Sequence, residues 1–161
     1  MNIIFFGEDA ASNIVLQSLI EAEFNVLLVV SPYYDNLIHK RLENTCIRNQ
    51  IEYIRVQNLN DISFIKKLKM LAPDMIVITH FEKLLKNEII EIPKSGCINL
   101  HPSLLPYYRG MAPQHWPIIN GDSETGITVH YVDQTADTGD IILQRKVKIE
   151  TNMYVSDLQL E

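Results

Sequence analysis

The chain has little cysteine, little glycine and no excess of basic residues, and these shortages narrow the classes of protein to which it can belong. Among its 161 residues are two cysteines, Cys46 and Cys97, without a CxxC spacing, which indicates a reduced, cytoplasmic protein with buried or idle thiols. Fourteen lysines and arginines face twenty aspartates and glutamates, so the formal net charge is −6. That balance argues against a general nucleic-acid binder, which needs a basic face, but it permits one phosphorylated ligand held locally.

Long apolar runs and a leader sequence are also missing. No stretch reaches the roughly 20 apolar residues that span a bilayer. The opening stretch Met1–Gly7 lacks a basic start, so it predicts a first strand rather than a signal peptide. The five histidines show no HxH or HExxH spacing, and no metal is expected. An apolar fraction of 47% and a charged fraction of 21% suit one globular domain, residues 1–161.

Short apolar runs alternate with amphipathic stretches, a pattern typical of an α/β protein. Runs that are apolar on both faces predict a Rossmann-like, mostly parallel, twisted sheet with helices on both faces and right-handed crossovers. From Gly126 onward, two longer runs predict an antiparallel strand pair near the C-terminus. The predicted strands are Asn2–Phe6, Asn25–Val30, Tyr53–Val56, Asp74–Thr79, Cys97–Leu100, Thr128–Val132 and Ile141–Ile149, and the predicted helices are Ala10–Ala22, Leu37–Gln50 and one through Leu71 capped by Asn60 or Asp61.

Two helical stretches carry more specific expectations. In Ala10–Ala22, one apolar face is expected to hold Ile14, Leu16, Leu19 and Ile20. The stretch Met153–Glu161 begins like a helix and stops after one or two turns, so we expect the natural chain to continue, with a cloning scar at Leu160-Glu161 as the alternative.

Parallel sheets bind ligands at the carboxyl ends of their strands, and Gly7–Asn13 follows the first strand. Free backbone N–H groups at a helix start can hold an anion. However, the GxGxxG fingerprint of a dinucleotide site is absent, and Glu8 and Asp9 would repel a phosphate. Two interpretations stay open, namely substrate contact at Gly7 and Glu8, or an ordinary capping turn.

Asn99-Leu100-His101-Pro102 ends the last predicted parallel strand. Residues two apart on a strand share a face, so Asn99 and His101 point the same way. An amide can donate to a developing oxyanion and an imidazole can move a proton, which together suit acyl transfer. Taken alone, the pair leaves a structural histidine as the alternative.

The surrounding residues extend this pair into a longer motif. The run Asn-Leu-His-Pro-Ser-Leu-Leu-Pro-Tyr-Tyr-Arg-Gly over Asn99–Gly110, with Asp137-Thr138-Gly139 downstream, resembles enzymes that transfer a formyl group from N10-formyltetrahydrofolate. The resemblance runs over nearly the whole chain, as far as Val147–Ile149. It implies N10-formyltetrahydrofolate as co-substrate, no metal, and a cis Leu105–Pro106 bond.

The resemblance also implies a catalytic trio. Asn99 would hold the oxyanion, and His101 would accept the proton of the attacking amine or stabilise the intermediate as an imidazolium. Asp137 would order a water for proton relay, and it is favoured over Asp140 by the family's alignment. Asp133 and Asp140 would then form the loop.

In relatives the folate pteridine lies between two loops, which here are His80–Leu85 and Val132–Asp140. Leu84 and Leu85 would form apolar walls of the folate site, with packing in the core as the alternative. Lys83 would meet the glutamate tail of the folate, with a solvated lysine as the alternative. The implied folate-binding residues are Phe81, Lys83, Leu84, Leu85, Val132, Asp133 and Asp140.

Three branches of the family differ in their acceptor. Enzymes acting on glycinamide ribonucleotide carry a glycine-rich loop that Gly7–Asn13 lacks. Methionyl-tRNA formyltransferases share an Arg-Gly-x-Ala-Pro segment but add a carboxyl-terminal barrel, and the length and acidity of this chain count against them. The stretch Arg109–Gly121 looks most like the third branch, which formylates nucleotide-linked amino sugars for cell-surface polysaccharide such as O-antigen. Arg109 would pair with a diphosphate or form a structural salt bridge, and Met111 and Gln114 would also contact the acceptor.

These observations predict a nucleotide-sugar N-formyltransferase acting on dTDP-linked 3- or 4-amino-dideoxyhexoses. Methionyl-tRNA formylation is the alternative enzyme, and a folate- or nucleotide-binding fragment without turnover is the non-catalytic alternative. The expected partners are the small-molecule substrate and a second copy of the chain, bound through a carboxyl-terminal region beyond Glu161. No nucleic acid and no membrane are expected.

Overall fold

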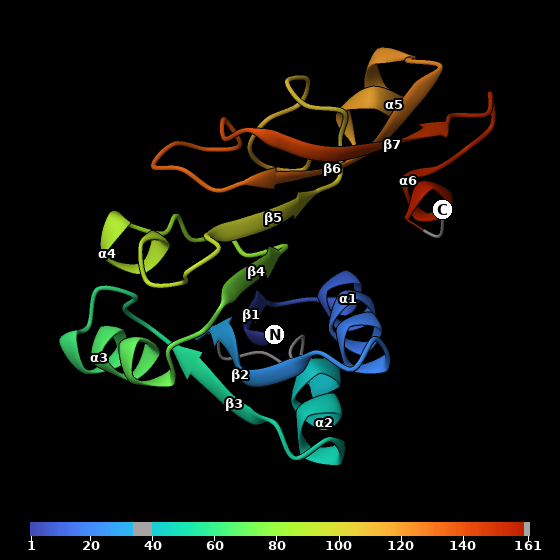
Figure 1. Cartoon of the computed structure of the whole chain (residues 1–161). Coiled ribbons are helices and arrows are strands. Elements are labelled where there is room, and N and C mark those ends of the chain that lie inside the picture. The colour runs from blue at the N-terminus through green and yellow to red at the C-terminus, as the bar shows by residue number, and fades with distance from the viewer. Residues whose placement is uncertain (34–39, 160–161) are drawn as a thin grey trace. The chain divides into compact units, whose positions relative to one another are not determined.

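The computed structural model describes residues 1–33 and 40–159 (Figure 1). It divides into two compact units, Met1–Ile98 and Asn99–Glu161. Seven strands form one mixed sheet in the order β3-β2-β1-β4-β5-β6-β7. Residues 37–39 of the predicted second helix, and the terminal Leu160-Glu161, lie outside the described residues.

The first unit is a parallel sheet covered on both faces. Strand β1 pairs with β2 and β4, and β2 pairs with β3, all in parallel. Helices α1 and α2 lie on one face, and α3 and α4 on the other (Figure 1). This confirms the Rossmann-like prediction; the one-turn helix α4 was not predicted. The elements are β1 (Asn2–Gly7), α1 (Ala10–Glu21), β2 (Asn25–Pro32), α2 (Lys40–Arg48), β3 (Glu52–Val56), α3 (Ile62–Leu71), β4 (Met75–Thr79) and α4 (Asn87–Ile90).

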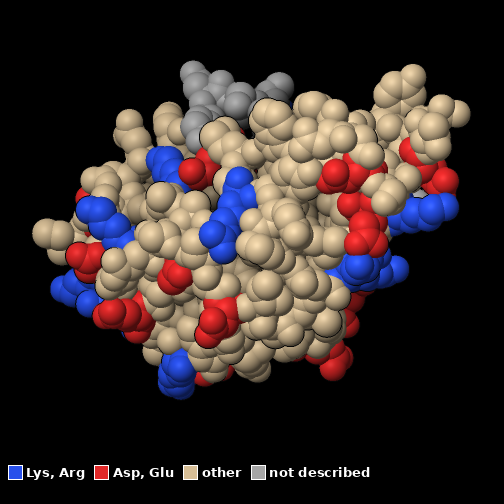
Figure 2. Space-filling model, turned by 90° about the horizontal axis from the view of Figure 1, so that it is seen from above, with Lys and Arg blue, Asp and Glu red and all other residues tan. Residues whose placement is uncertain are grey.

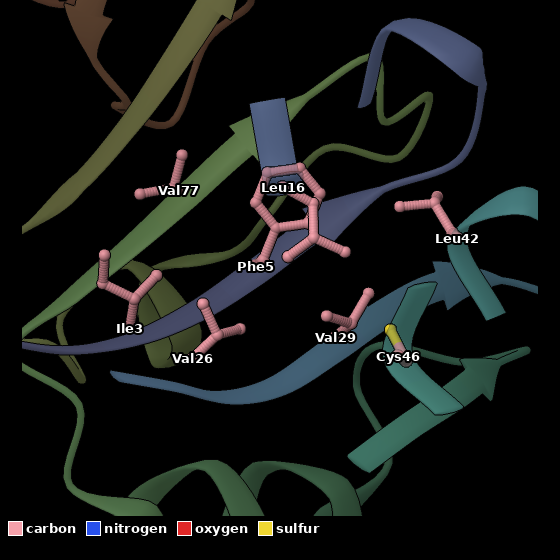
Figure 3. Packing of buried hydrophobic residues seen from close by; sticks show 8 residues of the cluster. All are labelled: Ile3, Phe5, Leu16, Val26, Val29, Leu42, Cys46 and Val77. Atoms are coloured by element: carbon pink, nitrogen blue, oxygen red, sulfur yellow. The ribbon is translucent and has the colours of Figure 1, made fainter. Parts of the chain in front are cut away.

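A core between the sheet and helices α1 and α2 holds this unit together (Figure 3). In the β1–β2 ladder, Ile3 pairs with Val26 and Ile4 with Leu28, so Leu27 is an extra residue. The resulting bulge lets Val26 and Val29 both contribute to the core. The side chains drawn in Figure 3 are Ile3, Phe5, Leu16, Val26, Val29, Leu42, Cys46 and Val77.

Helix α1 differs from its prediction in the face that it buries. Ser12 and Leu16, four residues apart, are buried, whereas Ile14 is 61% exposed. At 3.6 residues per turn, position 14 lies about 200° from both of them, so it points away from the core. Leu19 and Ile20 pack against the core as predicted.

Both thiols are buried and unpaired, as the sequence predicted. Burial raises the pKa of Cys46 to about 12, with a smaller contribution from Glu43, and burial also raises the pKa of Cys97 to about 12. Neither thiol is therefore ionised near neutral pH.

The second unit is built on an antiparallel pair. Strands β6 and β7 pair from Glu124 opposite Lys148 to His130 opposite Ile141, which confirms the predicted pair. Strand β6 begins four residues earlier than Thr128, the predicted start. The elements of this part of the chain are β5 (Cys97–His101), α5 (Trp116–Asn120), β6 (Glu124–Tyr131), β7 (Ile141–Lys148) and α6 (Val155–Leu158).

A buried threonine holds the turn that follows β5. The Thr128 hydroxyl donates to the Ser103 carbonyl at 2.6 Å and accepts from the Leu105 N–H at 3.1 Å. Gln144 Nε2 donates to the same hydroxyl at 2.9 Å and to the Leu105 carbonyl at 2.8 Å. The Leu105–Pro106 bond in this turn is cis, as the resemblance implied.

Across residues 1–33 and 40–159, no helix has the length and apolar character needed to cross a membrane.

Leu16→Ala tests the α1 core contact. Because Leu16 is fully buried, the substitution should lower the free energy of unfolding by about 2–5 kcal/mol. Ile14→Ala, on the exposed face of the same helix, should change it by less than about 1 kcal/mol. Urea unfolding followed by circular dichroism measures both, and equal losses would contradict the assignment of faces.

Candidate active site

The end of β5 brings an amide and an imidazole to one place in the second unit. His101 is 4% exposed, and its Nε2 lies 2.8 Å from the main-chain oxygen of Tyr108. A carbonyl oxygen can only accept, so Nε2 carries the proton in this contact. The other ring nitrogen, Nδ1, lies 3.5 Å from Oδ2 of Asp137. Neutral His101 in this geometry therefore has its proton-accepting nitrogen facing the carboxylate.

Asp137 lies in the β6–β7 loop with a positive φ of 54°. The Gly110 N–H donates to its Oδ2 at 2.8 Å, and Asn99 Nδ2 donates to its Oδ1 at 3.3 Å. Burial on its own would raise the pKa of Asp137, but the contact with His130, the Gly110 N–H and the charge of His101 outweigh burial and lower it. Asp137 is therefore a carboxylate at neutral pH.

The surroundings of Gly139 explain why the Asp137-Thr138-Gly139 motif ends in glycine. A Cβ at this position would lie 1.9 Å from the Tyr131 carbonyl oxygen, so only glycine fits. The Tyr131 N–H in turn donates to the Asp140 carbonyl at 2.9 Å, which closes the loop against the end of β6. This close approach of two main-chain segments holds the end of the loop that carries Asp137.

The two other aspartates of the loop have different surroundings. The Asp133 carboxylate accepts from the Thr135 N–H at 2.9 Å and from the Thr138 hydroxyl at 2.8 Å. These bonds lower the pKa of Asp133, with the Thr138 hydroxyl contributing most. The Asp140 side chain is exposed. Of the three aspartates, Asp137 is the one in contact with His101.

His130 belongs to the same cluster, although the sequence analysis assigned it no role. It is 2% exposed on β6, and its Nε2 lies 3.2 Å from Asn99 Nδ2 and 3.5 Å from Asp137 Oδ1. Its Nδ1 donates to the Tyr131 carbonyl at 2.8 Å. One signal was available, because Thr128 and His130 are polar residues two apart in the strand and so share a face.

The arrangement can stabilise charge and move a proton. A carboxylate lies beside two imidazoles and an amide, and two of these groups, His101 and His130, are almost fully buried. An amide N–H can bind an oxyanion, and an imidazole next to a carboxylate can take up a proton as an imidazolium. These are the groups needed for acyl transfer to an amine. No metal-binding group of three or more His, Cys, Asp or Glu side chains occurs among the described residues.

Two predicted acceptor residues, Gly7 and Glu8, lie in the first unit at the end of β1. Asp9 caps α1 by accepting from the Ser12 N–H at 2.9 Å, and the Ser12 hydroxyl donates to the Thr79 carbonyl at 2.7 Å. A Cβ on Gly7 would lie 2.7 Å from Ser12 Cβ, so the glycine permits this close approach. The capping turn is thus present, whereas substrate contact stays a prediction.

Charge gathers at this turn. Burial, together with Glu82 and Asp9, raises the pKa of Glu8 to about 7. Asp9 Oδ2 lies 2.6 Å from His80 Nδ1. That hydrogen bond raises the pKa of His80 and, against the opposing effect of burial, lowers the pKa of Asp9.

The predicted folate contacts of the first unit have mixed environments. Phe81 packs edge-on against Phe6, with ring centroids 5.1 Å apart, and Leu85 is 5% exposed. Leu84 is 68% exposed. Lys83 Nζ donates to the Gln57 carbonyl at 2.7 Å, so in this structure its ammonium contacts the protein.

The remaining predicted contacts belong to the second unit. Arg109 and Met111 are exposed, with Met111 at 78%, and Gln114 and Val132 are half-buried. Helix α5 begins at Trp116, two residues beyond Gln114.

The Rossmann-like fold and a cluster of groups suited to acyl transfer together indicate an acyl-transferring enzyme. The chain matches the formyl transferase family over residues 1–160, and it belongs to that family of formyl-transferring enzymes. The resemblance seen in the sequence is thereby confirmed.

The chain is similar to curated methionyl-tRNA formyltransferases. The chain is 41% identical over 164 residues to the methionyl-tRNA formyltransferase of Clostridioides difficile, covering 98% of this chain and 53% of the relative. It is 40% identical over 153 residues to that of Thermodesulfovibrio yellowstonii, covering 91% of this chain and 50% of the relative. The chain thus spans about half the length of the curated relatives it matches.

Solved structures support the fold. A phosphoribosylglycinamide formyltransferase from Bacillus halodurans matches with a TM-score of 0.83 and 23% identity, over 99% of this chain and 86% of that one. A sugar 3N-formyl transferase crystallised with dTDP and 5-N-formyl-THF matches with a TM-score of 0.74 and 24% identity, over 99% and 56%. At these identities the likeness concerns the fold alone.

The predicted nucleotide-sugar acceptor is wrong on this comparison. Relatives at 34–41% identity over most of the chain are methionyl-tRNA formyltransferases. The segment Arg109–Pro113 could not separate the branches, because the tRNA branch shares its Arg-Gly-x-Ala-Pro pattern. The expectation that no nucleic acid is bound also loses its support, because these relatives are named for a tRNA acceptor.

Gly139→Ala tests the loop closure. With its new Cβ 1.9 Å from the Tyr131 oxygen, the loop must shift, and we expect a loss of about 1–3 kcal/mol in stability and displaced imidazole NMR signals of His101 and His130. Gly121→Ala is the control, since no atom lies within 4 Å of its Cβ, although its φ of 71° makes alanine cost roughly 1 kcal/mol. Unmoved imidazole signals in Gly139→Ala would contradict the assignment.

Proposed function

We propose that this chain carries the formyl-transfer centre of a methionyl-tRNA formyltransferase, which moves the formyl group of N10-formyltetrahydrofolate to the amine of methionyl-tRNA. The observation that carries the chemistry is the contact of Asp137 with both Asn99 and His101, at 3.3 and 3.5 Å. The identity of the relatives supports the acceptor.

The reaction begins when the neutral amine of methionine attacks the formyl carbon of the folate. A C–N bond forms, and the carbonyl electrons move onto oxygen. Asn99 donates an N–H to this oxyanion, giving up one of its present bonds to His130 or Asp137.

The amine proton passes to His101 at Nδ1, because Nε2 is already bound to the Tyr108 carbonyl. Asp137, lying next to Nδ1, stabilises the imidazolium that forms. Collapse of the intermediate breaks the bond to N10 of the folate, and His101 returns the proton to that nitrogen. The products are formylmethionyl-tRNA and tetrahydrofolate.

The acidic net charge is compatible with an RNA acceptor. Net charge averages over all surfaces, whereas the end of an aminoacylated RNA needs only local contacts. On the face in Figure 2, basic side chains are scattered among acidic ones. Lys146 Nζ lies 2.6 Å from Glu124 Oε1, so part of the chain's basic charge is paired with acidic charge.

A direct assay decides the acceptor. The chain is incubated with N10-formyltetrahydrofolate and, separately, with methionyl-tRNA, a methionyl acceptor-stem RNA, glycinamide ribonucleotide and a dTDP-amino sugar. Mass spectrometry should show a formyl gain on the methionyl RNAs. Gain only on another acceptor would overturn the tRNA assignment, and no gain on any acceptor would contradict catalysis by this chain.

Substitutions test the roles of the trio. His101→Ala should lower kcat by at least ~100-fold, the scale of losing a general base. Asp137→Asn should lose far more activity than Asp140→Asn, because Asp137 contacts His101 and the Asp140 side chain is exposed. Steady-state kinetics on variants shown to be folded by circular dichroism measures this, and the reverse order would assign the role to Asp140.

A further inference from the structure

Tyr108 contacts the proposed centre through its main chain. Its carbonyl accepts from His101 Nε2 at 2.8 Å, and two residues later the Gly110 N–H donates to Asp137 at 2.8 Å. One short segment therefore holds both members of the His101–Asp137 pair with backbone atoms. The position of that backbone sets the position of the pair.

The conformation of this segment is unfavourable for a residue with a side chain. Tyr108 has a φ of 56°, in the left-handed region that a non-glycine residue adopts only where its surroundings hold it. Gly110 and Ala112 also have positive φ values, of 82° and 55°. The Tyr108 carbonyl and the Gly110 N–H of this segment face His101 and Asp137, respectively.

The Tyr108 hydroxyl supplies an anchor. It donates to Asp122 Oδ2 at 2.5 Å and accepts from Asn120 Nδ2 at 3.0 Å. Both partners lie at the carboxyl end of α5, where the Asp122 N–H donates to the Pro117 carbonyl at 2.9 Å. The hydrogen bond to Asp122 raises the pKa of Tyr108, so the phenol stays a proton donor at neutral pH.

We propose that Tyr108 is a positioning residue of the formyl-transfer centre: its hydroxyl, anchored on Asp122, fixes its own carbonyl as the acceptor for His101 Nε2 and so makes Nδ1 the nitrogen that takes the proton. The catalytic part of this inference rests on the proposed function. The structural part concerns only the tautomer of His101.

The chemical reason lies in two competing acceptors. A carboxylate next to a neutral imidazole favours the tautomer with the proton on Nδ1, because Nδ1–H can donate to it. That tautomer would place a lone pair on Nε2 and leave Nδ1 unable to accept a proton. The Tyr108 carbonyl opposes it by accepting from Nε2 at 2.8 Å, a closer contact than the 3.5 Å between Nδ1 and Asp137.

Tyr108→Phe removes the hydroxyl and keeps the ring. We expect kcat to fall by roughly 10- to 100-fold, with the KM of both substrates unchanged, since binding groups are untouched and the proton acceptor is mispositioned. In ¹⁵N NMR spectra of histidine-labelled protein, the neutral His101 signals should shift from the Nε2–H toward the Nδ1–H tautomer. Comparison with His101→Gln assigns those signals.

Asp122→Ala removes the anchor from the other side and should produce the same two changes. The double variant should be no worse than either single variant, because one hydrogen bond is lost in all three. Tyr107→Phe is the matched control, a neighbouring tyrosine with a 70% exposed side chain, and it should behave as wild type.

The outcomes separate the two proposals. An unchanged His101 tautomer in both Tyr108→Phe and Asp122→Ala would overturn the positioning role, even if stability or KM changed. A shifted tautomer in these variants, together with a wild-type chain that forms no formyl product, would support the positioning role and overturn the proposed function. Additive losses of kcat in the double variant would show that Tyr108 and Asp122 do not act through one hydrogen bond.

Discussion

The second unit depends on keeping one carboxylate charged in a place that is half closed to water. Burial disfavours the charge on Asp137, and three segments of the chain compensate for it. Gly110 donates a main-chain N–H, Asn99 donates an amide, and the rings of His101 and His130 lie beside the two carboxylate oxygens. Charge and geometry are thus coupled, because the groups that keep Asp137 ionised also fix the direction in which it meets His101.

The fold was largely predictable because its strands are buried on both faces. Such strands read as continuous apolar runs, and β1, β2 and β4 were placed to within two residues on that basis. Prediction failed where the signal is short or ambiguous. Helix α4 has only four residues. Ile14 was placed on the core face because hydrophobicity alone does not show which face of α1 packs against the sheet.

The site was predictable in part. Alternation along β5 put Asn99 and His101 on one face, whereas Asp137 came from the resemblance and not from any pattern of spacing. The contacts of Tyr108 and Gly110 with His101 and Asp137 escaped notice because main-chain atoms make them, and residue type does not reveal such contacts. The acceptor was mispredicted because net charge and chain length describe the whole molecule, while an acceptor is recognised by a few local groups.

The predominance of main-chain contacts around Asp137 has a consequence for divergence within such proteins. The Tyr108 carbonyl and the Gly110 N–H contact His101 and Asp137 whatever side chain stands at the position between them. Arg109 and Met111 in this segment are exposed. Because the contacts to His101 and Asp137 come from the main chain of this segment, substitutions at these two positions can accumulate without disturbing the geometry of the pair.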